Sequence, residues 1–166
     1  MSYLTGDFKI DFDKKIVQGN LIYMLIPIKN GSEIIFDTKA LNIKKVYYIE
    51  DIDKNITSEI EFRYGEEDDT LGKQLIIPLN YNTKEKEYYY IRIIYETTED
   101  GTSAQFLEKE QTLGKNHSFF FTQSALISGR SLFPCQDTPA IKFGHHLKVI
   151  VPSDLVGMIS GIYQEK

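Results

Sequence analysis

The chain has 166 residues, 42% of them hydrophobic and 26% charged, a balance typical of a soluble globular domain rather than of a disordered or fibrous chain. The net charge is −5, basic residues form no stripe, and no apolar stretch approaches the roughly 18 residues that span a bilayer, so neither nucleic-acid nor membrane partners are expected. A single cysteine, Cys135, and the lack of a basic and then apolar leader predict a cytoplasmic protein that folds without disulfides.

Short runs of alternating apolar and polar residues dominate the chain. A period of two places the apolar side chains on one face of a β-strand, and antiparallel pairing is the natural arrangement for strands buried on one face only. In chain order, the alternation predicts strands at residues 8–12, 60–64, 91–95 and 141–151. Clusters of turn-forming residues are found at 13–15, 29–32, 65–70, 80–86 and 99–102.

The spacing of these turns is typical of a meander or sandwich rather than of alternating strands and helices. One short helix is expected at residues 123–128, ahead of Gly129. Eleven tyrosines and ten phenylalanines also favour strands over helices. The sequence therefore predicts one all-β domain over residues 1–166, with roughly eight to ten strands around a core between sheets.

Residues able to carry chemistry are few. Adjacent positions on a strand point to opposite faces, so His145 and His146 cannot share one metal ion, and His117 has no second ligand at a suitable spacing. Cys135 has no neighbouring cation or helix N-terminus to lower its pKa, which favours a buried packing thiol over a nucleophile. From the residues alone, the chain is a β-rich domain with no metal site and no assigned reaction.

A motif in the last third of the chain changes this interpretation, because it resembles a signature of the gluzincin aminopeptidases. That family includes aminopeptidase N, aminopeptidase B and leukotriene A4 hydrolase. The matching residues are Thr122-Gln123, Arg130 and Phe133-Pro134-Cys135-Gln136-Asp137-Thr138-Pro139.

The form Cys-Gln-Asp-Thr-Pro resembles the leukotriene A4 hydrolase and aminopeptidase B branch in particular. Further segments resemble that branch in the same order along the chain. They are Phe12-Asp13 with Gly19, residues 36–43, and residues 104–107 with 110–115. These collinear matches extend the resemblance over nearly the whole chain.

The resemblance implies a saddle-like antiparallel β-sandwich, the N-terminal domain of a larger metallopeptidase, here expected to be truncated. Such a domain is non-catalytic and packs on the catalytic domain of the same polypeptide, which cleaves peptide substrates with zinc. The family's His-Glu-x-x-His zinc motif does not occur in this sequence, so zinc is expected in the full-length enzyme only. A stand-alone protein-interaction module, derived from that domain and without peptidase activity, is the alternative.

The resemblance also assigns roles to individual residues. The segment Gln123, Ser124 and Ala125 matches the part of the domain that lines the rim of the peptide cleft. Relatives carry Gln or Glu where this sequence has Ala125, and a methyl group cannot hydrogen-bond the substrate amine. We expect Arg130 to satisfy turn carbonyls or a carboxylate, and Asp137 to cap the turn before Thr138. The residues expected to maintain the motif's structure are Arg130, Pro134, Cys135, Asp137 and Pro139.

Overall fold

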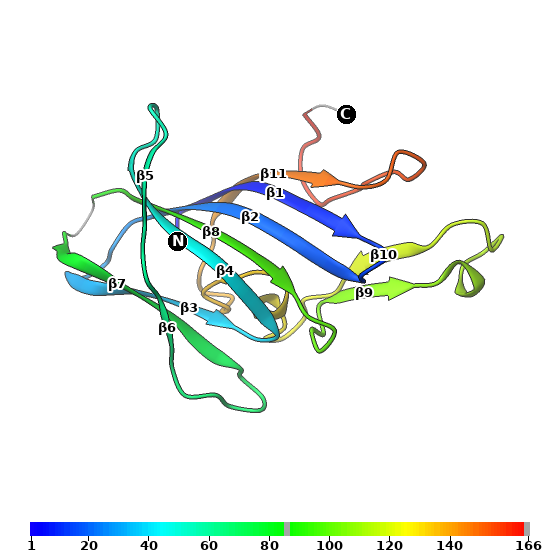
Figure 1. Ribbon diagram of the computed structural model, residues 1–166, viewed down its shortest axis with the longest axis horizontal. Coiled ribbons are helices and arrows are strands. Elements are labelled where there is room, and N and C mark those ends of the chain that lie inside the picture. The colour runs from blue at the N-terminus through cyan, green and yellow to red at the C-terminus, as the bar shows by residue number, and fades with distance from the viewer. Residues whose placement is uncertain (85–86, 165–166) are drawn as a thin grey trace.

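The computed structural model describes residues 1–84 and 87–164, without the side chains of residues 80–82, and strands dominate it (Figure 1). Two short 3-10 helices, η1 (Lys109–Gln111) and η2 (Gly129–Ser131), interrupt the strands. None of the helices in the described residues has the length and apolar character needed to cross a membrane. The strands are β1 (Tyr3–Asp11), β2 (Ile16–Leu25), β3 (Gly31–Thr38), β4 (Leu41–Asp51), β5 (Ile56–Glu59), β6 (Arg63–Tyr64), β7 (Lys73–Thr83), β8 (Tyr89–Thr97), β9 (Ala104–Leu107), β10 (Phe119–Thr122) and β11 (Gly144–Ile150). The prediction of an all-β domain is confirmed.

The strands form three sheets. A six-stranded sheet has the order β11-β1-β2-β8-β4-β5, a three-stranded sheet the order β3-β7-β6, and β9 and β10 form a two-stranded ribbon. Pairing is antiparallel except between β1 and β11, which run parallel from the pair Tyr3 and Gly144 to the pair Lys9 and Ile150. The antiparallel pairing expected for the strand at 141–151 is therefore wrong where it meets β1. Residue alternation reports which face of a strand is buried but not the direction of its neighbour.

The core lies between the six-stranded and three-stranded sheets. Every second side chain of β2 and of β8 is buried, as the period of two predicts. Tyr23 of β2 contacts Phe36 of β3 across the core, with ring centroids 4.8 Å apart. Full burial of one such side chain contributes roughly 1.5–3 kcal/mol, so these faces account for much of the folding energy. The fully buried members of the core with the largest side chains are Leu4, Leu21, Tyr23, Phe36, Leu75, Ile77, Ile91, Ile93 and Tyr95.

Several local predictions were wrong at their boundaries. The strand expected at 141–151 is confined to residues 144–150, and β3 begins at Gly31, inside the turn expected at 29–32. The strand expected at 60–64 is confined to Arg63 and Tyr64, because residues 60–62 cross from the six-stranded sheet, which contains β5, to the three-stranded sheet, which contains β6. Strand β7 continues to Thr83, whose hydroxyl donates to the Gly31 carbonyl (3.0 Å), so the turn expected at 80–86 begins too early. The part of that turn at residues 85–86 lies outside the described residues.

The helix expected at residues 123–128 does not form. Residues 125–128 form a turn instead, and helical structure begins only at Gly129. Leu126 has a φ of 61°, a left-handed conformation that a right-handed helix cannot include. The chain therefore enters η2 from a turn rather than from a helix.

Gly19 of β2 allows one contact that links the six-stranded sheet to the loop after η2. A Cβ at this position would lie 2.2 Å from the ring of Tyr95, so any side chain would displace that ring. The Tyr95 hydroxyl donates to the carbonyl of Leu132 (2.9 Å). Gly19 thus leaves room for the fully buried Tyr95 to hydrogen-bond the loop after η2.

Two fully buried tyrosines of the core differ in one respect that is testable. Tyr95 has its hydrogen bond to Leu132, whereas the hydroxyl of Tyr23 has no hydrogen-bond partner in the described part of the chain. We expect Tyr95→Phe to lower the free energy of unfolding by about 1 kcal/mol, because a buried hydrogen bond is lost. We expect Tyr23→Phe to leave it unchanged or to raise it by up to about 1 kcal/mol, because an unpaired buried hydroxyl is removed. Urea unfolding of the two variants measures both values, and equal losses would contradict this account.

Candidate functional site

Residues 129–139, which carry most of the motif and which we call the motif loop, are attached to the end of β3. The backbone N–H of Asp37 donates to the carbonyl of Cys135 (2.8 Å), and the N–H of Cys135 donates to the carbonyl of Asp37 (3.2 Å). The N–H of Lys39 also donates to the carbonyl of Arg130 (3.0 Å). The loop therefore continues the hydrogen bonding of the three-stranded sheet.

Arg130 lies at the centre of this attachment, and its side chain is only 9% exposed. Its Nε donates to Oδ2 of Asp137 (3.0 Å), and its Nη1 donates to the carbonyl of Leu71 (2.9 Å). Its Nη2 lies 3.6 Å from Oδ2 of Asp37, and that same oxygen accepts the N–H of Asp137 (3.0 Å). One guanidinium therefore connects two carboxylates and one carbonyl from three segments of the chain.

Asp137 is directed back toward η2 rather than toward Thr138, where the sequence had placed its cap. Its Oδ2 also accepts the backbone N–H of Arg130 (3.2 Å), while the N–H of Thr138 donates to the carbonyl of Gln136 (2.8 Å). A Cβ on Gly129 would lie 2.8 Å from Oδ1 of Asp137, so this close approach requires glycine. Asp137 thus fixes the start of η2.

The remaining motif residues differ in burial. Cys135 is buried, and burial, together with the nearby carboxylates of Asp137 and Asp37, raises the pKa of its thiol to about 12. The thiol is therefore protonated at neutral pH and is a poor nucleophile. Pro134 is buried beside it, whereas Pro139 is exposed.

Gln123, Ser124 and Ala125, which we call the rim segment, lie between β10 and η2 with all three side chains exposed. Its backbone is nevertheless anchored, because the N–H of Gln123 donates to the carbonyl of Ser103 (2.9 Å). The hydroxyls of Ser124 and Ser103 also form a short hydrogen bond, and the N–H of the fully buried Ser103 donates to Oγ of Ser131 in η2 (3.0 Å). Ser103 therefore joins the rim segment to the motif loop.

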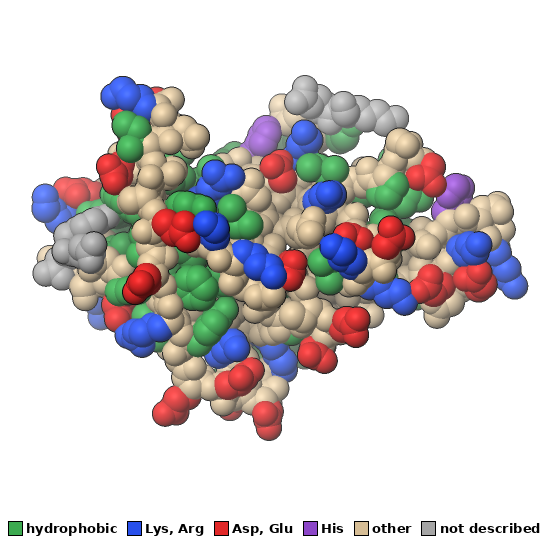
Figure 2. Space-filling view, viewed as in Figure 1, with side chains coloured by type: hydrophobic (Ala, Val, Ile, Leu, Met, Phe, Trp, Pro, Cys, Tyr) green, Lys and Arg blue, Asp and Glu red, His purple; other side chains and the backbone are tan. Residues whose placement is uncertain are grey.

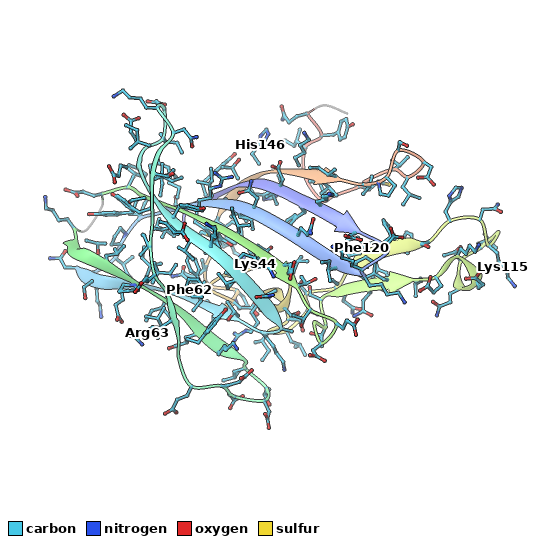
Figure 3. All side chains as sticks on the ribbon, in the orientation of Figure 1. Lys44, Phe62, Arg63, Lys115, Phe120 and His146 are labelled. Atoms are coloured by element: carbon cyan, nitrogen blue, oxygen red, sulfur yellow. The ribbon has the colours of Figure 1, made fainter. Side chains whose placement is uncertain are left out.

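The ribbon of β9 and β10 presents two different aromatic faces. On the inner face, Phe106 contacts Phe12 (5.8 Å between ring centroids) and Phe120 (4.9 Å). Figure 3 shows Phe120 beside the ends of β1 and β2. On the outer face, the rings of Phe119 and Phe121 stack at 5.9 Å and remain 53% and 36% exposed. Exposed aromatic rings are unusual on a two-stranded ribbon, because such a ribbon gains little stability alone.

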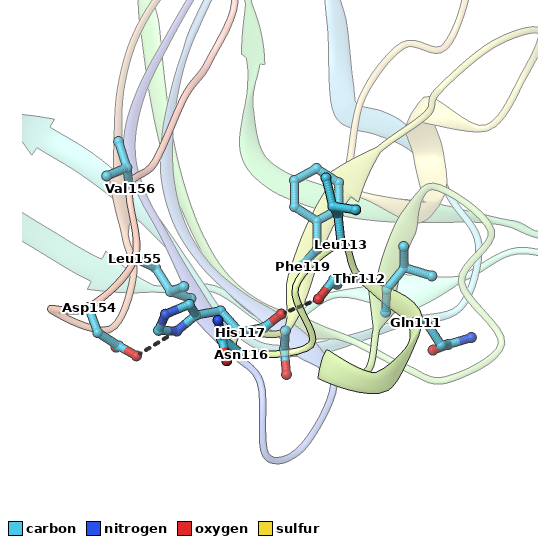
Figure 4. Close-up of a pocket in the computed structure, with 11 residues that line it drawn as sticks. Gln111, Thr112, Leu113, Asn116, His117, Phe119, Asp154, Leu155 and Val156 are labelled. Atoms are coloured by element: carbon cyan, nitrogen blue, oxygen red, sulfur yellow. Dashed lines mark hydrogen bonds and ion pairs between the residues drawn. The ribbon is translucent and has the colours of Figure 1, made fainter.

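An open hollow lies at the end of the same ribbon, against the segment that follows β11 (Figure 4). Leu107, Phe119 and Leu155 contribute apolar side chains to its lining. Nδ1 of His117 lies 3.4 Å from Oδ2 of Asp154, so this pair joins the loop before β10 to the chain after β11. The sequence had placed His117 in a loop without indicating this partner.

The histidines are spread over the surface. His146 stands on β11 (Figure 3), whereas His117 lies in the loop before β10. Within residues 1–84 and 87–164, no group of three or more His, Cys, Asp or Glu side chains is placed to hold a metal ion. Figure 2 shows Lys and Arg interspersed with Asp and Glu over one face of the molecule, so this face is not dominated by one sign of charge.

Sequence reasoning singled out Arg130, Asp137 and residues 123–125 but missed the residues that contact them. A signal for Asp37 was available, because it lies in the segment 36–43, which resembles the same family. Ser103 and the carbonyl of Leu71 carried no signal, because their roles depend on contacts between distant parts of the chain.

Residues 3–166 match the family described as the peptidase M1 N-terminal domain. The chain is 39% identical over 151 residues to leucine aminopeptidase 2-2 of Scheffersomyces stipitis, covering 90% of this chain and 22% of that protein. It is 36% identical over 158 residues to leucine aminopeptidase 2 of Lodderomyces elongisporus, covering 95% of this chain and 23% of that protein. The chain thus spans less than a quarter of the length of these relatives.

Solved structures share the fold of this chain. Native yeast LTA4 hydrolase superposes with a TM-score of 0.76 at 26% identity, covering 91% of this chain and 23% of that one. The M1 zinc metallopeptidase of Deinococcus radiodurans superposes with a TM-score of 0.74, covering 99% of this chain and 35% of that one. At 12% identity, the second likeness concerns the fold alone.

The buried Arg130 cluster makes a prediction with an internal control. We expect Arg130→Ala to lower the free energy of unfolding by about 3 kcal/mol or more, because it leaves the mostly buried Asp137 carboxylate unpaired. The control is Arg63→Ala, which removes an exposed ion pair with Glu33 (2.6 Å) and should cost at most about 1 kcal/mol. Chemical unfolding of both variants provides the comparison, and a loss at Arg130 as small as that at Arg63 would contradict a structural role.

Proposed function

The chain belongs to the peptidase M1 N-terminal domain family, and on this premise we propose that it is the non-catalytic N-terminal domain of a zinc aminopeptidase resembling leukotriene A4 hydrolase. In this proposal, the domain packs on the catalytic domain of the same polypeptide and shapes the rim of the peptide cleft. The anchored yet exposed rim segment is the observation that carries the proposal.

The geometry of the rim segment suits a surface that must meet a substrate at a fixed position. Its backbone is held by Ser103, and Ser103 is held by Ser131, so the segment is tied to a buried scaffold. The side chains of Gln123 and Ala125 remain exposed, whereas the hydroxyl of Ser124 is hydrogen-bonded to that of Ser103. Residues positioned by such a scaffold lose little entropy when they contact a ligand.

Ala125 sets the chemistry of this rim. An exposed methyl group offers neither donor nor acceptor to a substrate ammonium, so amine recognition in the full-length enzyme falls to other residues. Gln123 retains an exposed amide on the same segment, which can hydrogen-bond a peptide there.

The outer face of the β9–β10 ribbon is the surface that we propose for packing on the catalytic domain. Phe119 and Phe121 are stacked and exposed there, and the ribbon leads directly into the rim segment. Covering two aromatic rings next to the cleft would bury apolar area and fix the rim against the catalytic residues.

Zinc and the catalytic groups belong, in this proposal, to the part of the enzyme outside this domain. The full-length protein would be cytoplasmic and would remove N-terminal residues from peptides with metal-activated water. A stand-alone interaction module, using the same aromatic face for another protein, is the second candidate. The length of the natural polypeptide and the presence of a His-Glu-x-x-His motif in it distinguish the two.

Charge introduced on the aromatic face tests the packing proposal. In the full-length enzyme, we expect Phe119→Glu combined with Phe121→Glu to lower kcat/KM at least tenfold and to separate thermal unfolding into two transitions. The physical reason is that two carboxylates would be buried against an apolar partner at a cost of several kcal/mol. Steady-state kinetics and calorimetry provide the measurements.

The control is Ile52→Glu, at an exposed apolar residue of similar accessibility (42%) in the β4–β5 turn. It should change neither activity nor the number of transitions, because surface substitutions usually shift stability by less than about 0.5 kcal/mol. In the 166-residue chain alone, the paired glutamates should be equally harmless. Unaltered kinetics of the full-length double variant would rule out this face as the contact.

A second test concerns Ala125 in the full-length enzyme. If this position faces the substrate amine, Ala125→Gln adds one hydrogen bond to an ammonium, worth roughly 1.5–3 kcal/mol when well aligned. We therefore expect kcat/KM to rise roughly tenfold to a hundredfold for peptides with a free N-terminus. N-acetylated peptides serve as the control and should gain nothing. Equal gains for both substrates would show that the rim segment does not meet the amine.

A further inference from the structure

Asparagine or aspartate precedes glycine at two places in the chain, Asn30-Gly31 and Asp100-Gly101. Glycine has no Cβ, so its backbone nitrogen is less hindered than that of any other residue toward the side chain before it. Asn30 is exposed in the segment between β2 and β3, and Gly31 is the first residue of β3. Neither pair has a part in the function proposed above.

The two glycines differ in their surroundings. Apart from its chain neighbours, no described heavy atom lies within 4 Å of a Cβ built on Gly31. A Cβ on Gly101 would instead lie 3.2 Å from the carbonyl oxygen of Thr98 and 3.4 Å from that of Ser131. The N–H of Gly101 also donates to the carbonyl of Thr98 (3.1 Å), which fixes this glycine in a turn. The fold thus leaves the pair at Gly31 open and encloses the pair at Gly101.

The pairing of β3 with β7 is irregular at the open pair. Gly31 lies opposite Thr83 and Glu33 lies opposite Pro78, so the register shifts between these two positions. Proline has no backbone N–H to donate to the ladder. From Glu33 to the end of the strand, the register runs without a break. The backbone next to Asn30 is therefore held less firmly than the rest of β3, and it can rotate.

We propose that Asn30 is a site of spontaneous deamidation in the folded protein. The backbone nitrogen of Gly31 attacks Cγ of Asn30 and forms an N–C bond, and the side-chain nitrogen leaves as ammonia with the amide proton of Gly31. Water then opens the resulting five-membered imide. Addition of water at Cγ gives aspartate, whereas addition at the main-chain carbonyl carbon gives isoaspartate, in which the backbone runs through Cγ. Water is the co-reactant, and nothing is oxidised or reduced.

The modification changes the start of the three-stranded sheet. Either product adds one negative charge to a chain whose net charge is −5. Isoaspartate also adds one carbon to the backbone immediately before β3. The Gly31 carbonyl accepts the hydroxyl of the buried Thr83 (3.0 Å), and a longer backbone displaces this carbonyl from its donor. The inference stands independently of the proposed peptidase role.

Incubation of the full-length protein in mildly alkaline buffer, followed by peptide mapping, measures the conversion. Asn55 and Asn116 are matched controls, because both are likewise exposed but precede Ile56 and His117. We expect Asn30 to convert at least about tenfold faster than either control, because both following residues carry a Cβ. Equal rates at the three positions, or an unconverted Asn30, would overturn the proposal.

A single methyl group tests the role of Gly31. Gly31→Ala places its Cβ in open space and at a φ outside the left-handed region, so the fold should be retained. We expect this variant to slow the conversion of Asn30 at least about tenfold, because the methyl group hinders the attacking nitrogen. An unchanged rate in the variant would contradict attack by this nitrogen.

Unfolding in guanidinium chloride separates the effect of the fold from that of the sequence. Asp100 can isomerise through the same kind of imide, with loss of water, once Gly101 is released from its turn. We expect unfolding to speed this isomerisation at least about tenfold and to change the rate at Asn30 by less than about threefold. A larger acceleration at Asn30 would show that the fold protects it, and an Asp100 that isomerises equally fast in the folded chain would show that the surroundings of the glycines do not matter. Either result would overturn the proposal.

Discussion

The guanidinium of Arg130 is the group on which the arrangement of the candidate site depends. It reaches Asp137 in its own loop, Asp37 at the end of β3, and the Leu71 carbonyl before β7. These partners are far apart in the sequence, so the cluster forms only when the three-stranded sheet and the motif loop are both in place. A buried cation without such partners would cost several kcal/mol, which restricts the loop to this position.

The motif loop is also held from the side of the six-stranded sheet. Tyr95 donates to the carbonyl of Leu132, and Gly19 leaves room for the Tyr95 ring. The loop is therefore fixed by an ionic cluster on one side and by a buried aromatic residue on the other. Since each attachment involves a different sheet, a change in the packing of either sheet would be transmitted to the loop and, through Ser131 and Ser103, to the rim segment.

The sequence predicted those features that depend on local patterns. Strands β1 and β8 followed from alternation, and the motif indicated Arg130 and Asp137. The features that were wrong or missed depend on distant contacts: residues 60–62 change sheets, β11 runs parallel to β1, and Asp37 completes the arginine cluster. A pattern of single residues specifies which face is buried, but it does not specify which distant backbone that face will meet.

The turn after the rim segment shows how the backbone around Ala125 is held in place. Leu126 is 93% exposed and has a φ of 61°, a conformation that costs roughly 1 kcal/mol for a residue other than glycine. Its own side chain gains nothing from burial, so the conformation must be imposed from outside. Ser103 fixes Gln123 on one side, and Asp137 fixes the start of η2 on the other, leaving a few residues to connect two fixed points. The backbone of the rim segment is thus set by its anchors, and we expect a substitution at residue 125 to change the exposed side chain without moving the backbone.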